Sequence, residues 1–284
     1  YHHGEASLNG AIVGMAQDYV GSNNINLLLP NGQFGTRLAG GKDSASERYI
    51  FTQTNPTTKH VFNATDNNIL TYLDDDGTPI EPVFYAPIIP MVLVNGCKGI
   101  GTGFSTDIMC HNPKDIILYL RALLRGEANP TQTLMPFYRG FKGTIIQIAP
   151  KKYLIKGVYE RSAKDKNTIT ISELPIGTWT DDYKSMLEKE LESPKKVVKE
   201  YTDMSTDKHV SFTVKFYPGQ LDKLVANKID ENTNGLEKQM KLVTSNTSTN
   251  MYLFDADERL RKYDCVEDIV KDYYRTRIGM YRDR

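Results

Sequence analysis

Cysteine is scarce in this sequence, and the few cysteines present are widely spaced. There are three among 284 residues, Cys97, Cys110 and Cys265. An odd number at this spacing matches neither a disulfide framework nor a zinc site, and it favours a reducing compartment. Long apolar runs are missing too. The longest, residues 84–94, is interrupted by prolines and falls short of the ~20 residues of a membrane helix, so we expect no membrane span.

Net charge is also absent. The 35 basic residues balance the 35 acidic ones, which argues against a simple basic nucleic-acid-binding protein. A local basic face is not excluded, because affinity for phosphates depends on where lysine and arginine lie. The acidic run Asp74–Asp76 is expected to form a solvated turn.

The sequence has no initiator methionine and no signal peptide. It opens on Tyr1-His2-His3-Gly4-Glu5, and we expect it to be a fragment of a longer protein. It also contains no P-loop and no aspartate cluster suited to a metal-binding domain. We therefore expect neither a nucleotide site nor a metal site in this chain.

The first 52 residues predict a helix, a short strand, a glycine-rich loop and a second strand. Apolar residues follow a helical spacing from Leu8 to Val20, and a short strand is expected over 25–29. Residues 31–47 contain too many glycines for a helix or a strand interior, so they are expected to form a long loop or wing. Strand-like residues return over 48–52. This order predicts the second part of a winged-helix domain, whose first helices would precede Tyr1.

The remaining sequence predicts a mixed α/β (α+β) fold. Residues 55–82 are polar and turn-rich, and 104–113 is expected to be a loop. Strands are expected over 144–148, 153–155, 168–171 and 210–216, and helices over 114–124, 180–191, 220–225 and 266–284.

Arg48 and Tyr49 form the most informative dipeptide of the chain. A guanidinium keeps its charge and can hold two phosphate oxygens at once, so its neighbour could present a phenol to a phosphodiester. The alternative is a half-buried core tyrosine beside an unrelated surface arginine. The dipeptide by itself does not decide between them.

A glycine-rich segment, residues 99–103, follows an apolar run. A dinucleotide fingerprint would need a helix opening at its third glycine, and a loop is expected there instead. Flanking glycines leave Ile100 as the one large side chain, and an apolar residue presented in this way can wedge between base steps and bend DNA. The alternative is a tight loop with Ile100 in the core.

His2 and His3 lie just before the first expected helix. They could contact a phosphate together with the backbone N–H groups of that helix. The alternative is polar surface at a helix start, or one core histidine with satisfied hydrogen bonds. Two adjacent histidines cannot both face one metal from a regular element, so a metal site is rejected.

Taken together, these motifs resemble the DNA breakage–reunion region of eukaryotic-type (type IIA) topoisomerase II, over essentially the whole chain. The motifs are Tyr1–Glu5, Phe34–Arg37, Gly40–Asp43, Arg48–Tyr49, Gly99–Gly103, Glu173–Pro175 and Thr178–Thr180. The bacterial gyrase branch is similar but has a proline between the two histidines and an acid other than glutamate at that helix start. The sequence therefore resembles the eukaryotic branch, which includes enzymes of large DNA viruses.

The resemblance implies domains, roles and partners. It implies a winged-helix domain over 1–88, a tower domain over 89–263 and the start of a coiled-coil helix over 264–284. Tyr49 would be the nucleophile, with Arg48 and His3 beside it in catalysis, and Ile100 would intercalate. Further DNA contacts are expected at Lys42, Arg37, Ser7, His2 and Gln33.

The resemblance also implies an ATP-dependent enzyme that acts as a homodimer on double-stranded DNA, in the nucleus or in a viral setting. Mg²⁺ and ATP would both be bound by domains outside this chain, so the fragment alone is expected to be inactive. A phenol, with an ordinary pKa of about 10, needs local positive charge to act as a nucleophile. Two other hypotheses stay open: a non-catalytic DNA-bending module that uses Ile100, and an interaction scaffold without a DNA function.

Overall fold

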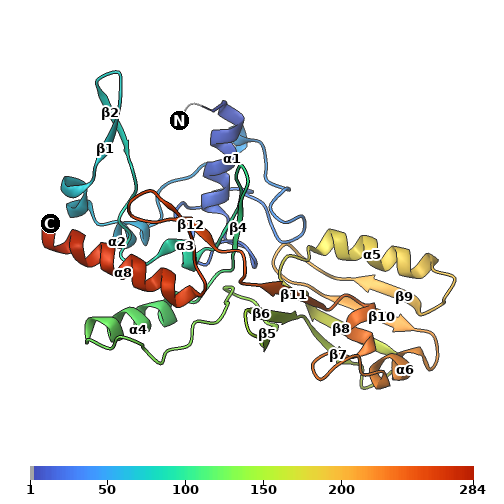
Figure 1. The fold of residues 1–284 in the computed structure, drawn as a ribbon. Helices are drawn as coiled ribbons and strands as arrows, with labels where there is room; N and C mark the ends of the chain where they lie inside the picture. Colours follow the sequence, from blue (N-terminus) through green and yellow to red (C-terminus); the bar gives the residue numbers. More distant parts are fainter. Residues whose placement is uncertain (1–2) are drawn as a thin grey trace.

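A computed structural model describes residues 3–284 and shows two lobes joined by a central three-stranded sheet (Figure 1). The mixed helix-and-sheet class expected from the sequence is confirmed. None of the helices in the described part of the chain has the length and apolarity to cross a bilayer.

The first lobe begins with α1 (Glu5–Ala16), which ends four residues before the expected Val20. After Ala16 the chain folds back along the helix, and its N–H groups form hydrogen bonds with the last carbonyls of α1, which have no partner within the helix. The Asn23 amide donates to the carbonyls of Gly14 at 2.7 Å and Gln17 at 2.9 Å. The backbone N–H of Leu27 donates to the backbone carbonyl of Met15 at 3.1 Å.

The two strands expected around the glycine-rich loop are nearly absent. Isolated bridges pair Leu28 with Thr54 and Asn31 with Phe51. Arg48 and Tyr49 lie instead in η1 (Glu47–Tyr49), a 3-10 turn closed by the Tyr49 N–H on the Ser46 carbonyl at 3.0 Å. The prediction of a strand over 48–52 is therefore wrong, whereas residues 31–47 form a loop as expected.

Residues 58–108 contain short helices and two hairpins. The elements are α2 (Thr58–Val61), η2 (Ala64–Ile69), β1 (Tyr72–Asp75), β2 (Thr78–Pro82), α3 (Met91–Val94), β3 (Cys97–Ile100) and β4 (Ser105–Ile108). Asp76 lies in the exposed turn of the first hairpin, as expected, whereas Asp74 and Asp75 lie in strand β1, so the prediction of a turn over the whole run Asp74–Asp76 is wrong. The expected loop over 104–113 is wrong, because its first part pairs with β3 as strand β4.

The first lobe is closed by α4 (Pro113–Leu124) and α8 (Val266–Asp283). Asn112 caps α4 by accepting from the Lys114 N–H at 3.0 Å. One core joins these helices to α3, including Leu93, Ile116 and Val270. Arg277 of α8 forms a buried ion pair with Asp66 at 2.6 Å, which ties η2 to the end of the chain.

The second lobe is a four-stranded antiparallel sheet with helices on it, and a three-stranded sheet connects it to the first lobe (Figure 1). The four-stranded sheet has the order β7 (Val158–Arg161), β8 (Thr168–Glu173), β10 (Phe212–Phe216), β9 (Val198–Asp203). Its helices are α5 (Thr180–Glu192), α6 (Gln220–Ala226) and α7 (Gly235–Gln239). The connecting sheet has the order β11 (Val243–Thr247), β6 (Lys152–Lys156), β5 (Thr144–Ala149), and β12 (Tyr252–Phe254) pairs with β13 (Leu260–Lys262).

Side chains along a strand point alternately to its two faces, and this alternation explains the core of the second lobe. Phe212, Val214 and Phe216 point inward from β10 and meet Tyr183 and Leu187 of α5. The core of the first lobe instead combines residues 89–134 with residues 251–270. The expected domain limits stay a prediction, and the cores favour grouping 89–134 with the first lobe.

Asn24 joins segments that are far apart in the sequence. It is 4% exposed, and its amide nitrogen donates to the carbonyls of Val94 at 2.9 Å, His111 at 3.1 Å and Phe137 at 3.0 Å. Its amide oxygen accepts from the Arg139 N–H at 2.8 Å. A single side chain therefore satisfies backbone groups from several segments.

His111 is buried at the same junction, and burial lowers its pKa to about 4. We expect the chain to lose stability as pH falls from about 6.5 to about 4, because the unfolded state then binds a proton that the folded state does not. From 1.36 kcal/mol per pKa unit, the loss approaches about 3 kcal/mol. Denaturant unfolding at a series of pH values between about 4 and 6.5 measures this loss in the free energy of unfolding. His111→Gln should flatten this slope, while the exposed control His60→Gln should keep it; an equal slope in both variants would contradict the prediction.

Candidate functional site

Tyr49 projects from the surface on the 3-10 turn η1. Its side chain is 71% exposed, and Arg48 beside it is exposed as well. The turn is held on its far side, where Phe51 and Asn31 exchange two backbone hydrogen bonds of 3.0 and 3.1 Å. Tyr49 is therefore not a core residue, and its phenol is accessible to a ligand as large as a nucleic acid.

Helix α1 lies next to this turn. A pocket of about 330 Å³ separates them, lined by Ala6, Gly10 and Val13 from the helix and by Ser44 and Glu47 from the segment before Tyr49. Glu5 and Asn9 complete the helix side of the pocket, and space is free where a side chain on Gly10 would lie.

The residues expected to contact DNA fall into two groups. His3 and Ser7 are exposed at the start of α1, and Gln33 and Lys42 are exposed on the glycine-rich loop. His2 lies outside the described residues.

Arg37 is placed differently from the expectation. Its side chain is 8% exposed, and its guanidinium turns inward onto Glu173, which is fully buried. Both terminal nitrogens donate to the carboxylate. The prediction of a DNA contact at Arg37 is therefore not supported, because a buried charge is held by its partner and is not free for a phosphate.

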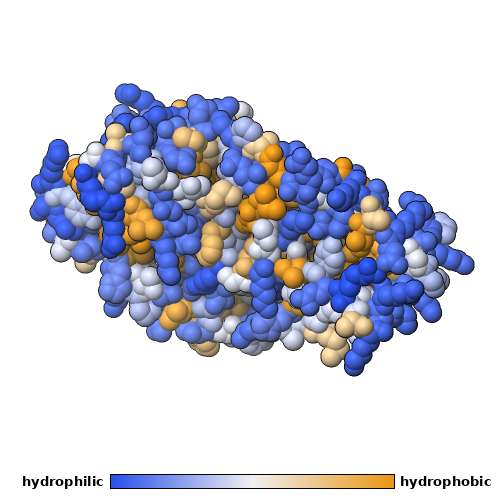
Figure 2. All heavy atoms as spheres, turned by 90° about the horizontal axis from the view of Figure 1, so that it is seen from below, coloured by the Kyte–Doolittle hydropathy of each residue, from blue (hydrophilic) through white to orange (hydrophobic). Residues whose placement is uncertain are grey.

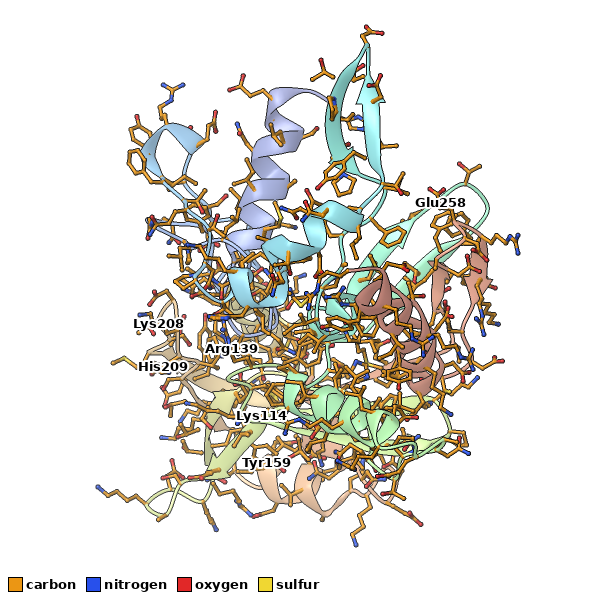
Figure 3. The ribbon with its side chains drawn as sticks, turned by 90° about the vertical axis from the view of Figure 1, so that its left-hand side faces the viewer. Lys114, Arg139, Tyr159, Lys208, His209 and Glu258 are labelled. Carbon is orange, nitrogen blue, oxygen red and sulfur yellow. The ribbon has the colours of Figure 1, made fainter. Side chains whose placement is uncertain are left out.

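Ile100 is 94% exposed at the tip of the β3–β4 hairpin. Gly99 has open space around it, and Gly103 adopts a φ of +81° that lets the chain turn back. The interpretation of Ile100 as a core residue is wrong. In Figures 1 and 3 this hairpin and the start of α1 extend toward the same side of the molecule.

Within residues 3–284, no group of three or more histidine, cysteine, aspartate or glutamate side chains is arranged to hold a metal ion. The surface is mostly hydrophilic on the face shown in Figure 2, with separate apolar patches.

A family model for the A subunits of DNA gyrase and topoisomerase IV matches residues 1–284. The chain belongs to this family. The expected resemblance to type II topoisomerases is thereby confirmed. The relatives below are from the eukaryotic and viral branch.

Relatives of this gyrase/topoisomerase chain include eukaryotic and viral proteins named DNA topoisomerase 2. It is 50% identical to that of Caenorhabditis elegans over 288 residues, covering 100% of this chain and 18% of the relative. It is 47% identical to the protein of Arabidopsis thaliana, and the match covers 100% of this chain and 19% of that protein. It is 39% identical to the protein of Acanthamoeba polyphaga mimivirus, and this match covers 100% of this chain and 26% of the viral protein. The chain thus spans about a fifth to a quarter of these relatives.

A solved structure of the Plasmodium falciparum topoisomerase II DNA-binding, cleavage and re-ligation domain is also similar. It superposes with a TM-score of 0.92 at 43% identity, covering 100% of this chain and 37% of that one. The gyrase/topoisomerase chain therefore has the fold of part of a cleavage and re-ligation domain.

Several residues that hold the site together belong to motifs singled out in the sequence, but their contacts could not be predicted from it. Asp43 accepts from the Thr36 N–H at 2.8 Å and from its hydroxyl, closing the glycine-rich loop. Glu173 and Trp179 come from the second lobe and contact the same loop. The signal available in the sequence is the Glu173–Pro175 and Thr178–Thr180 motif, which identifies a family but not a contact.

Proposed function

We propose that this chain is the nucleophile-bearing part of an ATP-dependent type II DNA topoisomerase. The observation that carries the proposal is an exposed Tyr49 directly after Arg48, on a turn fixed beside the start of α1. A DNA-bending module alone would not need this pair, so that alternative is not favoured. An interaction scaffold would not need Ile100 on a bare hairpin tip.

The proposed step is a transesterification. The Tyr49 oxygen forms a bond to phosphorus, the bond between phosphorus and the 3′ oxygen breaks, and the phenolic proton is transferred so that a 3′ hydroxyl leaves. The 5′ end stays joined to Tyr49, and attack by the 3′ hydroxyl reverses the step without an energy-rich cofactor. Positioning and charge stabilisation dominate phosphoryl transfer, and Arg48 supplies a fixed cation next to the phosphate.

The remaining partners belong to the same proposal. Double-stranded DNA would lie over α1, Lys42 and the β3–β4 hairpin, and two copies of the protein would cut both strands. Mg²⁺ and ATP would be bound outside this chain, and bound Mg²⁺ supplies positive charge to the phosphate and the leaving oxygen. We expect the isolated chain to be inactive. The protein would act in the nucleus or, if viral, in the host cytoplasm or virion.

Mapping the covalent adduct tests the proposal. The full-length protein is incubated with Mg²⁺ and a duplex radiolabelled at its internal backbone phosphates, stopped with denaturant, and digested with nuclease and protease, so that only the phosphate bonded to the protein keeps the label. We expect the label on the peptide that contains Tyr49. A label on a peptide with another exposed tyrosine, such as Tyr72 or Tyr85, or no adduct at all, would overturn the proposal.

Ile100→Ala should reduce DNA bending more than DNA binding. Partial unstacking of a base step costs a few kcal/mol, which a protruding apolar wedge offsets, and truncation removes most of that wedge. Because a bent duplex aligns the phosphate with Tyr49, cleavage should fall as well.

Fluorescence-measured bend angles and thermal melting on this variant check the prediction. A 94% exposed side chain predicts an unchanged melting temperature, whereas loss of a core side chain would cost ~2–5 kcal/mol. Leu124→Ala, at 62% exposure at the end of α4, is the matched control for an exposed apolar residue. An unchanged bend angle for Ile100→Ala would rule out the wedge.

A further inference from the structure

The buried Arg37–Glu173 ion pair crosses between the two lobes. Arg37 comes from the loop that precedes Tyr49, and Glu173 ends strand β8 of the second lobe. Glu173 also accepts from the backbone N–H of Lys142 at 3.2 Å and of Leu174 at 3.0 Å. With these partners its carboxylate is fixed in place, so the Arg37 side chain has one position available.

Trp179 adds a second contact between the same two segments. It precedes α5, and its ring fills the space above Gly40, where a Cβ would lie 2.3 Å from the indole nitrogen. The ring also meets Tyr19 edge-on, with centroids 5.7 Å apart. Only glycine at position 40 lets the loop approach the indole this closely.

The start of α5 is hydrogen-bonded to the loop backbone. The N–H groups of Thr180 and Asp181 donate to the carbonyls of Arg37 at 3.3 Å and Leu38 at 3.0 Å. These N–H groups belong to a helix start and have no partner within the helix. The loop therefore serves as the N-terminal cap of α5.

Further hydrogen bonds fix the glycine-rich loop between its contacts with the second lobe and the segment that leads to Tyr49. Gln17 donates to the carbonyls of Phe34 at 2.9 Å and Gly41 at 3.3 Å. Asp43 holds Thr36, and the Ala45 N–H donates to the Gln33 carbonyl at 2.9 Å. A continuous set of contacts thus runs from Glu173 to the segment that leads into Arg48 and Tyr49.

Elsewhere the two lobes are separated by a cleft in this region. A groove of about 530 Å³ lies between the loop around Gln33 and the β9–β10 connection at Asp207 and Lys208. Figure 3 shows Lys208 and His209 at the edge of the molecule, in the loop that joins those strands. The connection of the loop to the second lobe is therefore concentrated in the contacts of Arg37, Gly40 and the start of α5.

We propose that Arg37, Glu173 and Trp179 form a positioning clamp, through which the second lobe fixes the glycine-rich loop and hence the orientation of Arg48 and Tyr49. This inference rests on the proposed function for its effect on cleavage. None of the three touches DNA in this proposal. They act through the loop, so their loss should lower the cleaved fraction of DNA and leave its binding unchanged.

The test uses full-length protein with Glu173→Gln, with Trp179→Phe as a milder second variant. Glu237→Gln is the matched control, because Glu237 is another buried glutamate of the second lobe, paired with Lys156 at 2.8 Å and without a contact to the loop among its hydrogen bonds and ion pairs. Hydrogen exchange over residues 36–49, equilibrium DNA cleavage, duplex affinity and melting temperature are measured for all three.

We expect loop exchange to become at least about tenfold faster and cleavage to fall about tenfold or more in the clamp variants, because small displacements of a reacting group reduce rates strongly. Affinity for DNA should change less than about twofold. If Glu173→Gln does not fold, Trp179→Phe decides by the same measurements.

Two results would overturn the clamp. One is unchanged loop exchange in a folded clamp variant, and it needs no assumption about activity. The other is an equal fall in cleavage for Glu237→Gln at an equal loss of melting temperature, which would make the effect one of general stability. Failure of the proposed function is seen separately, as a wild-type protein that forms no adduct at Tyr49.

Discussion

Tyr49→Phe in the full-length protein is expected to abolish DNA cleavage and supercoil relaxation while duplex binding stays within about twofold. The substitution removes the one oxygen that can bond to phosphorus, and no neighbouring group on the turn replaces it. The ring is 71% exposed, so the loss of its hydroxyl leaves no buried group without a hydrogen bond, and the fold should be retained.

The measurement is the amount of covalent protein–DNA complex trapped by a denaturant quench, compared with binding to the same duplex. Tyr85→Phe is the matched control, because Tyr85 is also exposed, at 59%, and should behave like the wild type. Covalent DNA trapped on the Tyr49→Phe protein would refute the role of this tyrosine.

Arg48→Lys should lower the rate of cleavage by ~10²–10³, the usual effect of losing one preorganised charge contact at a transition state. Lysine keeps the positive charge but lacks the planar fork that holds two phosphate oxygens. Arg48 is exposed on the same 3-10 turn as Tyr49, so the cost should appear in rate and hardly in stability.

Single-turnover cleavage with saturating protein separates this rate from binding. Arg121→Lys, on the exposed side of α4, provides a control in which the same exchange is made far from the turn. Near-normal cleavage by Arg48→Lys would mean that this arginine is a structural residue and not part of the reacting centre.

Periodicity in the sequence predicts the regular elements of the second lobe well. The alternation of Phe212, Val214 and Phe216 is visible in the sequence and recurs as the inward face of β10. Strand β9 escapes such a prediction because it reads Val-Lys-Glu-Tyr-Thr-Asp, and only Val198 among these is buried. Its place in the sheet comes from backbone pairing with β10, which hydrophobic patterning cannot reveal.

The positions of the site residues can also be predicted only where they depend on neighbours in the sequence. The exposed positions of Ile100 and Lys42 follow from glycines around them, a local signal. The burial of Arg37 does not, because its partner lies 136 residues further along the chain. An arginine in a glycine-rich loop is normally free to meet a phosphate, and only the three-dimensional structure shows that this one is already paired.

Asn24 has a consequence for the order in which the chain folds. Its amide cannot be satisfied until segments 70, 87 and 113 residues away have arrived. Closing loops of this length is entropically costly and makes such contacts slow to form. The segment after α1, which leads into the nucleophile-bearing turn, should therefore be among the last to become ordered. Tyr49 would reach its position only after the segments around Val94, His111 and Phe137 have assembled on Asn24, so an incompletely folded first lobe would not present it to DNA.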